Sequence, residues 1–236
     1  MALAVFDIDG TLVTGASTEK RFFVELLRHG RIGPRQVLAA LWFLLRYTPR
    51  YGRHVFKKNK AYLAWLPEAE VRALADAWVH EHLAAAWFEP CCARLRRHQE
   101  ADDTVVLLSG TPQFIAEAIA RALGVAQVIG SDCIVERGRF RARPPRRHPF
   151  RAEKLALAAA LLPAHEVTVA YADSSYDLPL LTAAGTAVAV RPDEELAAHA
   201  AAAGWEIIGT VRRGPFGGLR AGPRQAAPAT DPLQRG

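Results

Sequence analysis

The sequence has few of the features that mark several large classes of protein. Among its 236 residues are only three cysteines, Cys91, Cys92 and Cys133, and none has metal-ligand spacing. An odd number of cysteines without a pairing pattern is typical of a reduced cytosolic protein. The longest apolar run, residues 37–45, is far too short to cross a bilayer. No signal peptide is visible before the first apolar run, so we expect a cytoplasmic protein.

Length and periodicity predict an α/β protein with an insert. Half of the residues are hydrophobic and 23% are charged, which is ordinary for a globular protein. Short apolar runs predict strands, and they fall at residues 3–6, 104–108, 125–129, 167–172, 186–190 and 205–208. Residues 15–88 show only helical patterns, so we expect a core of residues 1–14 and 89–211 with a helical cap between. Residues 212–236, rich in Gly, Pro, Ala and Arg, are expected to be a disordered tail.

One helix of the predicted cap is unusual. The segment Val37–Tyr47 is apolar almost all round, and such a helix is normally covered on all sides. We therefore expect it to be mostly buried. Because a basic stretch follows it at residues 49–60, binding to a lipid phosphate or a membrane surface is an alternative explanation.

Two aspartates follow the first predicted strand, in the segment Asp7-Ile8-Asp9-Gly10-Thr11. Side chains at i and i+2 of an extended chain point the same way, so both carboxylates are expected to face one volume beyond the strand. Open α/β sheets bind ligands at this edge. A divalent cation such as Mg²⁺ relieves the repulsion between the two acids. One carboxylate can then attack phosphorus while the other moves a proton. By itself, a pair of acids is more often a solvated turn.

Another polar segment, Ser109-Gly110-Thr111, lies between a predicted strand and a predicted helix. The Ser109 hydroxyl and the free N–H groups at such a turn make an anion site, and we expect Ser109 and the Gly110 N–H to bind phosphoryl oxygens. A plain helix-capping serine is the simpler alternative.

Two acids follow the strand at residues 167–172. Asp173 lies at its carboxyl end, where it can join the first aspartates as a metal ligand. Asp177, four residues later, is expected to orient a lysine or a metal-bound water. Both acids could instead cap the next helix. Lys154 lies in the first turn of a predicted helix at residues 151–162, and alone it would count as a surface lysine.

Four motifs follow one another along the chain: residues 7–11, residues 109–111, Lys154, and Asp173 with Asp177. In this order they resemble the haloacid dehalogenase superfamily of phosphohydrolases, and within it the phosphoserine-phosphatase-like subfamily IB hydrolases. The resemblance runs from Leu3 to about Gly209. It implies a Rossmann-like, doubly wound parallel α/β sheet with an inserted helical cap. It also implies Mg²⁺-dependent hydrolysis of a small phosphate monoester through an aspartyl-phosphate intermediate.

The resemblance assigns roles to the motif residues. Asp7 would be the nucleophile, Asp9 the proton donor and acceptor, and Lys154 the cation that holds Asp7 and the transferring phosphoryl group. The metal would be held by Asp7, by Asp173 and by the backbone carbonyl of Asp9. Thr11 would steady the loop.

The sequence also departs from the family. Phosphoserine phosphatases carry an acid where this chain has Ala16, which speaks against phosphoserine as the substrate, and Tyr176 replaces an Asn. A lipid-phosphate phosphatase or a phosphotransferase would use the same nucleophile. A non-catalytic anion-binding protein is a further alternative, against which the intact motif residues argue. Seven arginines in residues 137–151, which we name the basic loop, favour a solvated surface over nucleic-acid binding because aromatic residues are few there.

Overall fold

A computed structural model describes residues 2–161 and 167–212 of the chain. Six parallel strands form one sheet in the order β3-β2-β1-β6-β7-β8. Their bounds are β1 (Leu3–Phe6), β2 (Thr104–Pro112), β3 (Gln127–Ser131), β6 (Val169–Ala172), β7 (Thr186–Val190) and β8 (Glu206–Ile208). The strand order reverses between β1 and β6, which is the point where doubly wound sheets bind ligands. The predicted fold class is confirmed.

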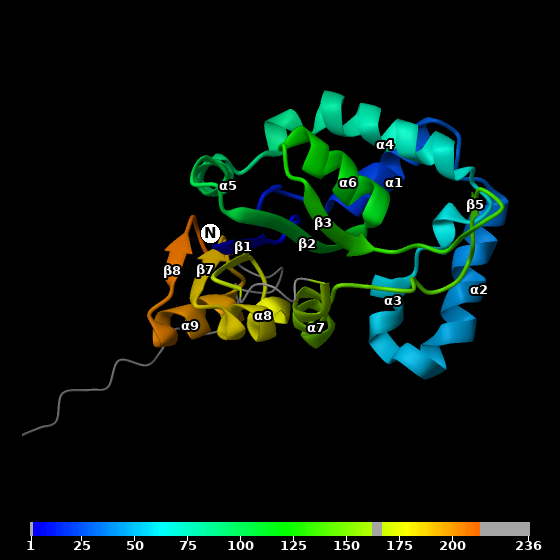
Figure 1. The fold of residues 1–236 in the computed structure, drawn as a ribbon. Coiled ribbons are helices and arrows are strands. Elements are labelled where there is room, and N and C mark those ends of the chain that lie inside the picture. Colours follow the sequence, from blue (N-terminus) through cyan, green and yellow to red (C-terminus); the bar gives the residue numbers. More distant parts are fainter. Residues whose placement is uncertain (1, 162–166, 213–236) are drawn as a thin grey trace, which may run out of the picture.

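Helices cover both faces of the sheet (Figure 1). Alternate residues of β1 point to opposite faces, so Phe6 joins one core cluster and Val5 another. The Phe6 side is covered by α1 (Thr18–Arg28), α4 (Glu68–His82), α5 (Glu89–Glu100) and α6 (Gln113–Ala122). The Val5 side is covered by α7 (Ala152–Leu161), α8 (Leu178–Ala183) and α9 (Glu194–Ala203).

The segment predicted to form the cap is helical, as expected. Besides α1 and α4 it contains α2 (Pro34–Tyr51), α3 (Val55–Lys58) and short 3-10 turns. α4 packs along α6, whereas α2 and α3 lie beyond the edge of the sheet (Figure 1). Phe43 of α2 packs in a small cluster of its own with Ala39 and Val55. The division into core and cap remains a prediction.

The expectation that α2 is mostly buried is wrong. Only Ala39 and Phe43 are buried among its 18 residues. Its other face carries exposed apolar side chains: Val37, Leu38, Leu41, Trp42 and Leu45. A helix that is apolar all round is buried only if other elements cover both of its sides, and among the described residues one side of α2 stays uncovered.

The basic loop begins inside a short antiparallel hairpin of β4 (Val135–Glu136) and β5 (Arg139–Phe140), and several of its arginines have partners. Arg141 and Arg143 both donate to Glu136, at 2.7 and 2.8 Å. Arg139 donates to the Trp65 carbonyl oxygen at 2.8 Å. These contacts hold the basic loop to its own hairpin and to the segment predicted to form the cap.

The C-terminal boundary lies slightly later than the predicted one. Arg212, expected to begin the tail, pairs with Asp193 in a β-bridge and contacts Asp173. The rest of the predicted tail, 213–236, lies outside the described residues. No helix in the described part of the chain is long and apolar enough to cross a membrane.

Candidate active site

The loop after β1 turns sharply beside Asp173. The Asp7 N–H donates to the Tyr171 carbonyl oxygen at 3.0 Å, which fixes the end of β1 to β6. Gly10 has φ +87°, a conformation that favours glycine. A Cβ at Gly10 would overlap the Asp173 carboxylate. Glycine at this position therefore lets the loop backbone lie directly against an acidic side chain.

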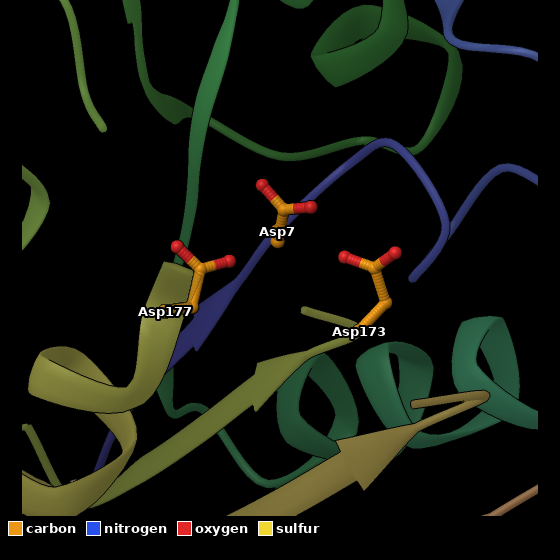
Figure 2. A group of neighbouring side chains, drawn as sticks. All are labelled: Asp7, Asp173 and Asp177. Carbon is orange, nitrogen blue, oxygen red and sulfur yellow. The ribbon is translucent and has the colours of Figure 1, made fainter. Parts of the chain in front are cut away.

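Three buried carboxylates meet at the carboxyl edge of the sheet. Asp7, Asp173 and Asp177 each offer an oxygen within 4.8 Å of the others. Figure 2 shows the three side chains directed toward a common volume, with Asp7 following β1 and Asp173 following β6. Asp177 comes from the 3-10 turn Ser175–Asp177 before α8. Burial and the Asp7 charge raise the pKa of Asp173 well above its usual range.

Lys154 supplies positive charge to this cluster. Its Nζ donates to Asp7 Oδ1 at 2.7 Å and to Asp177 Oδ2 at 2.9 Å. The side chain is only 2% exposed although it lies in the first turn of α7. Burial lowers the pKa of Lys154, but Asp177 and Asp7 outweigh it and hold that pKa above its ordinary value. The surface-lysine alternative is excluded by this burial.

Asp9 lies outside the three-carboxylate cluster, and its two carboxylate oxygens have partners of their own. Its Oδ1 accepts from the Thr18 N–H at 2.7 Å, and its Oδ2 accepts from the Thr111 hydroxyl at 2.9 Å. The chain bends at Ile8, directly after Asp7, and Asp9 pairs with Val13 in an isolated β-bridge, so the shared volume of the two acids stays a prediction. Burial, helped by the nearby Asp7 charge, raises the pKa of Asp9 even though these hydrogen bonds oppose the rise. A raised pKa suits a carboxyl group that carries a proton.

The predicted phosphate-binding segment lies at the irregular end of β2. Ser109 is buried, and its hydroxyl lies 3.3 Å from the Thr111 hydroxyl oxygen. Thr111 in turn reaches Asp9, so this segment touches the loop after β1. Thr11 is also buried, and within the described part of the chain its hydroxyl makes no hydrogen bond. The structure thus shows no contact through which that hydroxyl would steady the loop.

His148 is a buried residue that sequence reasoning missed. Ser131 Oγ donates to the Gly110 carbonyl oxygen at 2.6 Å, and it also lies 2.6 Å from His148 Nδ1. The single hydroxyl proton of Ser131 is used on Gly110, so His148 Nδ1 must carry the proton of the second bond. His148 Nε2 is then a bare acceptor, buried beside the phosphate-binding segment. Burial, aided by Lys60, lowers the pKa of His148 to about 3.

Arg212 is a second missed residue. Its Nη2 donates to the Asp173 carbonyl oxygen at 2.9 Å and to Asp173 Oδ2. Its Nε donates to the Arg191 carbonyl oxygen at 2.7 Å. The guanidinium therefore ties the Asp173 carboxylate to the segment after β7. No sequence pattern distinguished this arginine from the others in the predicted tail.

The donor set fits a hard divalent cation. Every ligand atom in the cluster is a carboxylate oxygen, the type that Mg²⁺ prefers. Three carboxylates face two cationic side chains, Lys154 and Arg212, so the cluster keeps an excess of negative charge in a buried place. Asp7 and Asp173 are thus suited to hold a cation. The side-chain oxygens of Asp9 are engaged elsewhere, so only its backbone carbonyl remains for that purpose.

Comparisons with known proteins agree with this arrangement. Residues 4–182 match the family model of haloacid dehalogenase-like hydrolases. A phosphoserine phosphatase of Mycobacterium tuberculosis is 30% identical over 223 residues, which cover 87% of this chain and 70% of that protein. A histidinol-phosphatase of Neisseria meningitidis is 26% identical over 219 residues, covering 87% and 97%.

Among solved structures, a protein of unknown function from Bordetella pertussis superimposes with a TM-score of 0.73 at 27% identity, covering 88% of this chain and 98% of that one. The sequence-based expectation of a hydrolase is confirmed, and the phosphatase names of the relatives are consistent with a phosphoric monoester hydrolase. The family match spans both the loop after β1 and the Lys154–Asp177 side of the site, so the chain belongs to the haloacid dehalogenase-like hydrolase family.

Proposed function

We propose that this protein is a Mg²⁺-dependent phosphatase that hydrolyses a small phosphate monoester through an aspartyl-phosphate on Asp7. One observation carries the proposal: Asp7 lies in a buried cluster with two further carboxylates, and a buried lysine donates to it at 2.7 Å. Lys154 fixes one Asp7 oxygen in place. This contact supports Asp7 as an oriented nucleophile, and the two neighbouring carboxylates support a bound cation beside it.

The first half of the reaction transfers the phosphoryl group. An Asp7 carboxylate oxygen attacks phosphorus in line while the bond from phosphorus to the ester oxygen breaks. Asp9 donates its proton to that leaving oxygen, and the alcohol departs. The raised pKa of Asp9 keeps this proton available. The hydrogen bonds from Thr18 and Thr111 keep the carboxyl group in position.

The second half restores the enzyme. Asp9, now ionised, takes a proton from a water molecule, and the resulting hydroxide attacks the phosphorus of the aspartyl-phosphate. The bond between phosphorus and the Asp7 oxygen breaks, which releases inorganic phosphate and frees Asp7. Lys154 and the Ser109–Gly110 segment bind the phosphoryl oxygens through both steps.

Mg²⁺, when bound, neutralises negative charge on the transferring group. Asp7, Asp173 and the Asp9 backbone carbonyl would hold it, and Asp177 orients Lys154 through the 2.9 Å hydrogen bond. Arg212 donates to Asp173 Oδ2 and so fixes the orientation of this carboxylate.

The proposed substrate class is the small phosphate monoesters. The two relatives are named for phosphoserine and for histidinol phosphate, which are both small phosphate monoesters. Ala16 is exposed and offers no charged group. Glu19, the nearest acid in α1, is already engaged by Lys60 and by the Tyr62 hydroxyl. We therefore place phosphoserine below other small monoesters, and we propose that residues 15–88 select among them.

The test is phosphate release from a panel of monoesters, measured with Mg²⁺ and with EDTA. The panel contains phosphoserine, phosphoethanolamine, sugar phosphates, nucleotides and a lysophosphatidate. We expect metal-dependent turnover that Asp7→Asn abolishes. Asp76→Asn is the matched control, because Asp76 is an exposed acid that pairs with Arg121 on the surface. Turnover that survives Asp7→Asn would overturn the mechanism, and no turnover on any ester by folded, Mg²⁺-loaded protein would favour a binding protein.

A further inference from the structure

The uncovered side of α2 forms a continuous apolar surface. Its residues follow the spacing i, i+1, i+4, i+5 and i+8, which places them on one side of a helix. They are between 51% and 80% exposed, and they are Val37, Leu38, Leu41, Trp42 and Leu45, here named the α2 stripe. α3 packs against α2 and exposes a further aromatic side chain, Phe56. Exposed apolar residues scattered singly need no explanation, but a stripe of this kind marks a contact surface.

The segment that carries the stripe has charges of a single sign, although Arg28, Arg31, Lys58 and Lys60 pair with acids from elsewhere in the chain. Between Leu26 and Pro67 the sequence contains no Asp or Glu and nine basic residues, which are Arg28, Arg31, Arg35, Arg46, Arg50, Arg53, Lys57, Lys58 and Lys60. Arg35 and Arg46 lie seven residues before and four residues after Trp42, so they share its side of the helix. Both are exposed. The stripe is thus bordered by cations.

We propose that the α2 stripe lies in the surface of an anionic lipid membrane, with α2 parallel to the membrane plane. An interfacial helix of this type places its apolar face among the acyl chains and its arginines at the level of the phosphate headgroups. Trp42 suits the same boundary because its indole ring has an apolar body and one N–H donor. The complete lack of acids over residues 26–67 removes the repulsion that an anionic surface would otherwise exert.

The position of α2 permits such an orientation. The helix lies at the opposite end of the molecule from α5 and β8 (Figure 1). Its inner side remains packed through Phe43 on the cluster with Ala39 and Val55, so membrane binding requires no unfolding of the cap. The three carboxylates lie just after β1, just after β6 and in the 3-10 turn before α8, and the cluster contains no residue of α2. The inference therefore does not rest on the proposed phosphatase activity.

Vesicle binding by the full chain tests the proposal. The probes are vesicles of phosphatidylcholine with about one third phosphatidylglycerol, and vesicles of phosphatidylcholine alone. We expect co-sedimentation at least about tenfold stronger with the anionic vesicles, weakened by high salt. The double variant L41E/L45E should reduce binding by at least about tenfold, whereas L41I/L45I, which keeps the apolar surface, should retain it.

Two further double variants test whether binding depends on the arginines beside the α2 stripe or on the net charge of the protein. R46Q/R50Q should weaken binding to the anionic vesicles, while R96Q/R97Q, which removes two exposed charges from α5, should not. Binding should shift tryptophan emission to shorter wavelength, and W42F should lose that shift although four other tryptophans remain.

Three outcomes would overturn the proposal. The first is binding by L41E/L45E equal to that of the unmodified chain, and the second is equal binding to neutral and anionic vesicles. The third is a stable dimer that L41E/L45E dissociates, without vesicle binding, because a second copy would then cover the stripe. Phosphate release from a soluble monoester reports on the active site separately: Asp7→Asn should abolish it and leave vesicle binding unchanged.

Discussion

Replacing Lys154 by Met tests how much the positive charge of Lys154 contributes to the free energy of unfolding. Met keeps most of the length of the side chain but removes the ammonium group, which donates to Asp7 and Asp177 at 2.7 and 2.9 Å. Two buried carboxylates then lose their shared counter-charge. Removing one partner of a buried ion pair costs about 3–5 kcal/mol of unfolding free energy. We expect a loss of that size at pH 8 in EDTA.

The loss should depend on pH in a defined direction. Burial, with a contribution from Asp7, raises the pKa of Asp177 to about 6 even though Lys154 opposes the rise. Without Lys154 this pKa rises further, while an unfolded aspartate titrates near 3.9. A folded-state pKa above the unfolded one means that the unfolded chain releases its proton first as pH rises. The free energy of unfolding therefore falls as pH rises from about 3.9, the pKa of an unfolded aspartate, through the pKa of folded Asp177. The unfolding free energy lost in Lys154→Met should accordingly be much smaller at pH 4.5 than at pH 8.

Urea unfolding, followed by tryptophan fluorescence, measures the free energy of unfolding of each variant at pH 4.5 and at pH 8. Lys58→Met is the matched control, since Lys58 forms a surface ion pair with Glu153 at 3.5 Å, and such pairs contribute about 1 kcal/mol or less. An equal loss for Lys154→Met at both pH values would refute the electrostatic reasoning and point to packing alone. A loss no larger than that of the control would refute the burial of the lysine.

The other predictions concern the residues around this cluster. Arg212→Gln removes the cation bound to Asp173, so Mg²⁺ should raise the melting temperature of this variant more than that of the unmodified chain; a smaller rise in differential scanning fluorimetry would contradict it. Gly10→Ala should abolish the Mg²⁺-induced rise because its Cβ overlaps Asp173, whereas Gly30→Ala, with φ +62° and nothing within 4 Å of a Cβ, should keep it. The pKa of His148 is lowered to about 3 by burial, so below pH 6.5 the unfolded chain gains a proton that the folded chain does not. His148→Gln should therefore lose less unfolding free energy than the unmodified chain between pH 7 and pH 4.5, and an equal loss in urea titrations would contradict this.

The strands and the first motif could be predicted because they depend on local pattern. β1 is a run of four buried residues, and the turn after it has the glycine that the close approach to Asp173 requires. The six predicted strands match the six strands of the sheet to within a few residues. The hydrogen bonds of Asp9 with Thr18 and Thr111 were not predicted, because they join the turn after β1 to other segments.

Contacts between distant residues could not come from local pattern. Lys154 and Asp7 are 147 residues apart, and only the family resemblance brought them together beforehand. His148 and Arg212 lie outside the family motifs, in segments rich in arginine where a histidine or one more arginine carries no signal. Only the folded chain brings His148 next to Ser131 and Arg212 next to Asp173.

The two faces of α2 show what hydrophobic pattern leaves undetermined. Periodicity reports which sides of a helix are apolar, and burial depends on whether another element covers each side. Phe43 has such a partner in the cap, while Leu45, two residues later, is 80% exposed. An apolar side that no described residue covers has a free-energy cost in water. That cost, together with the missing acids around it, is the physical reason to look for a surface outside the chain.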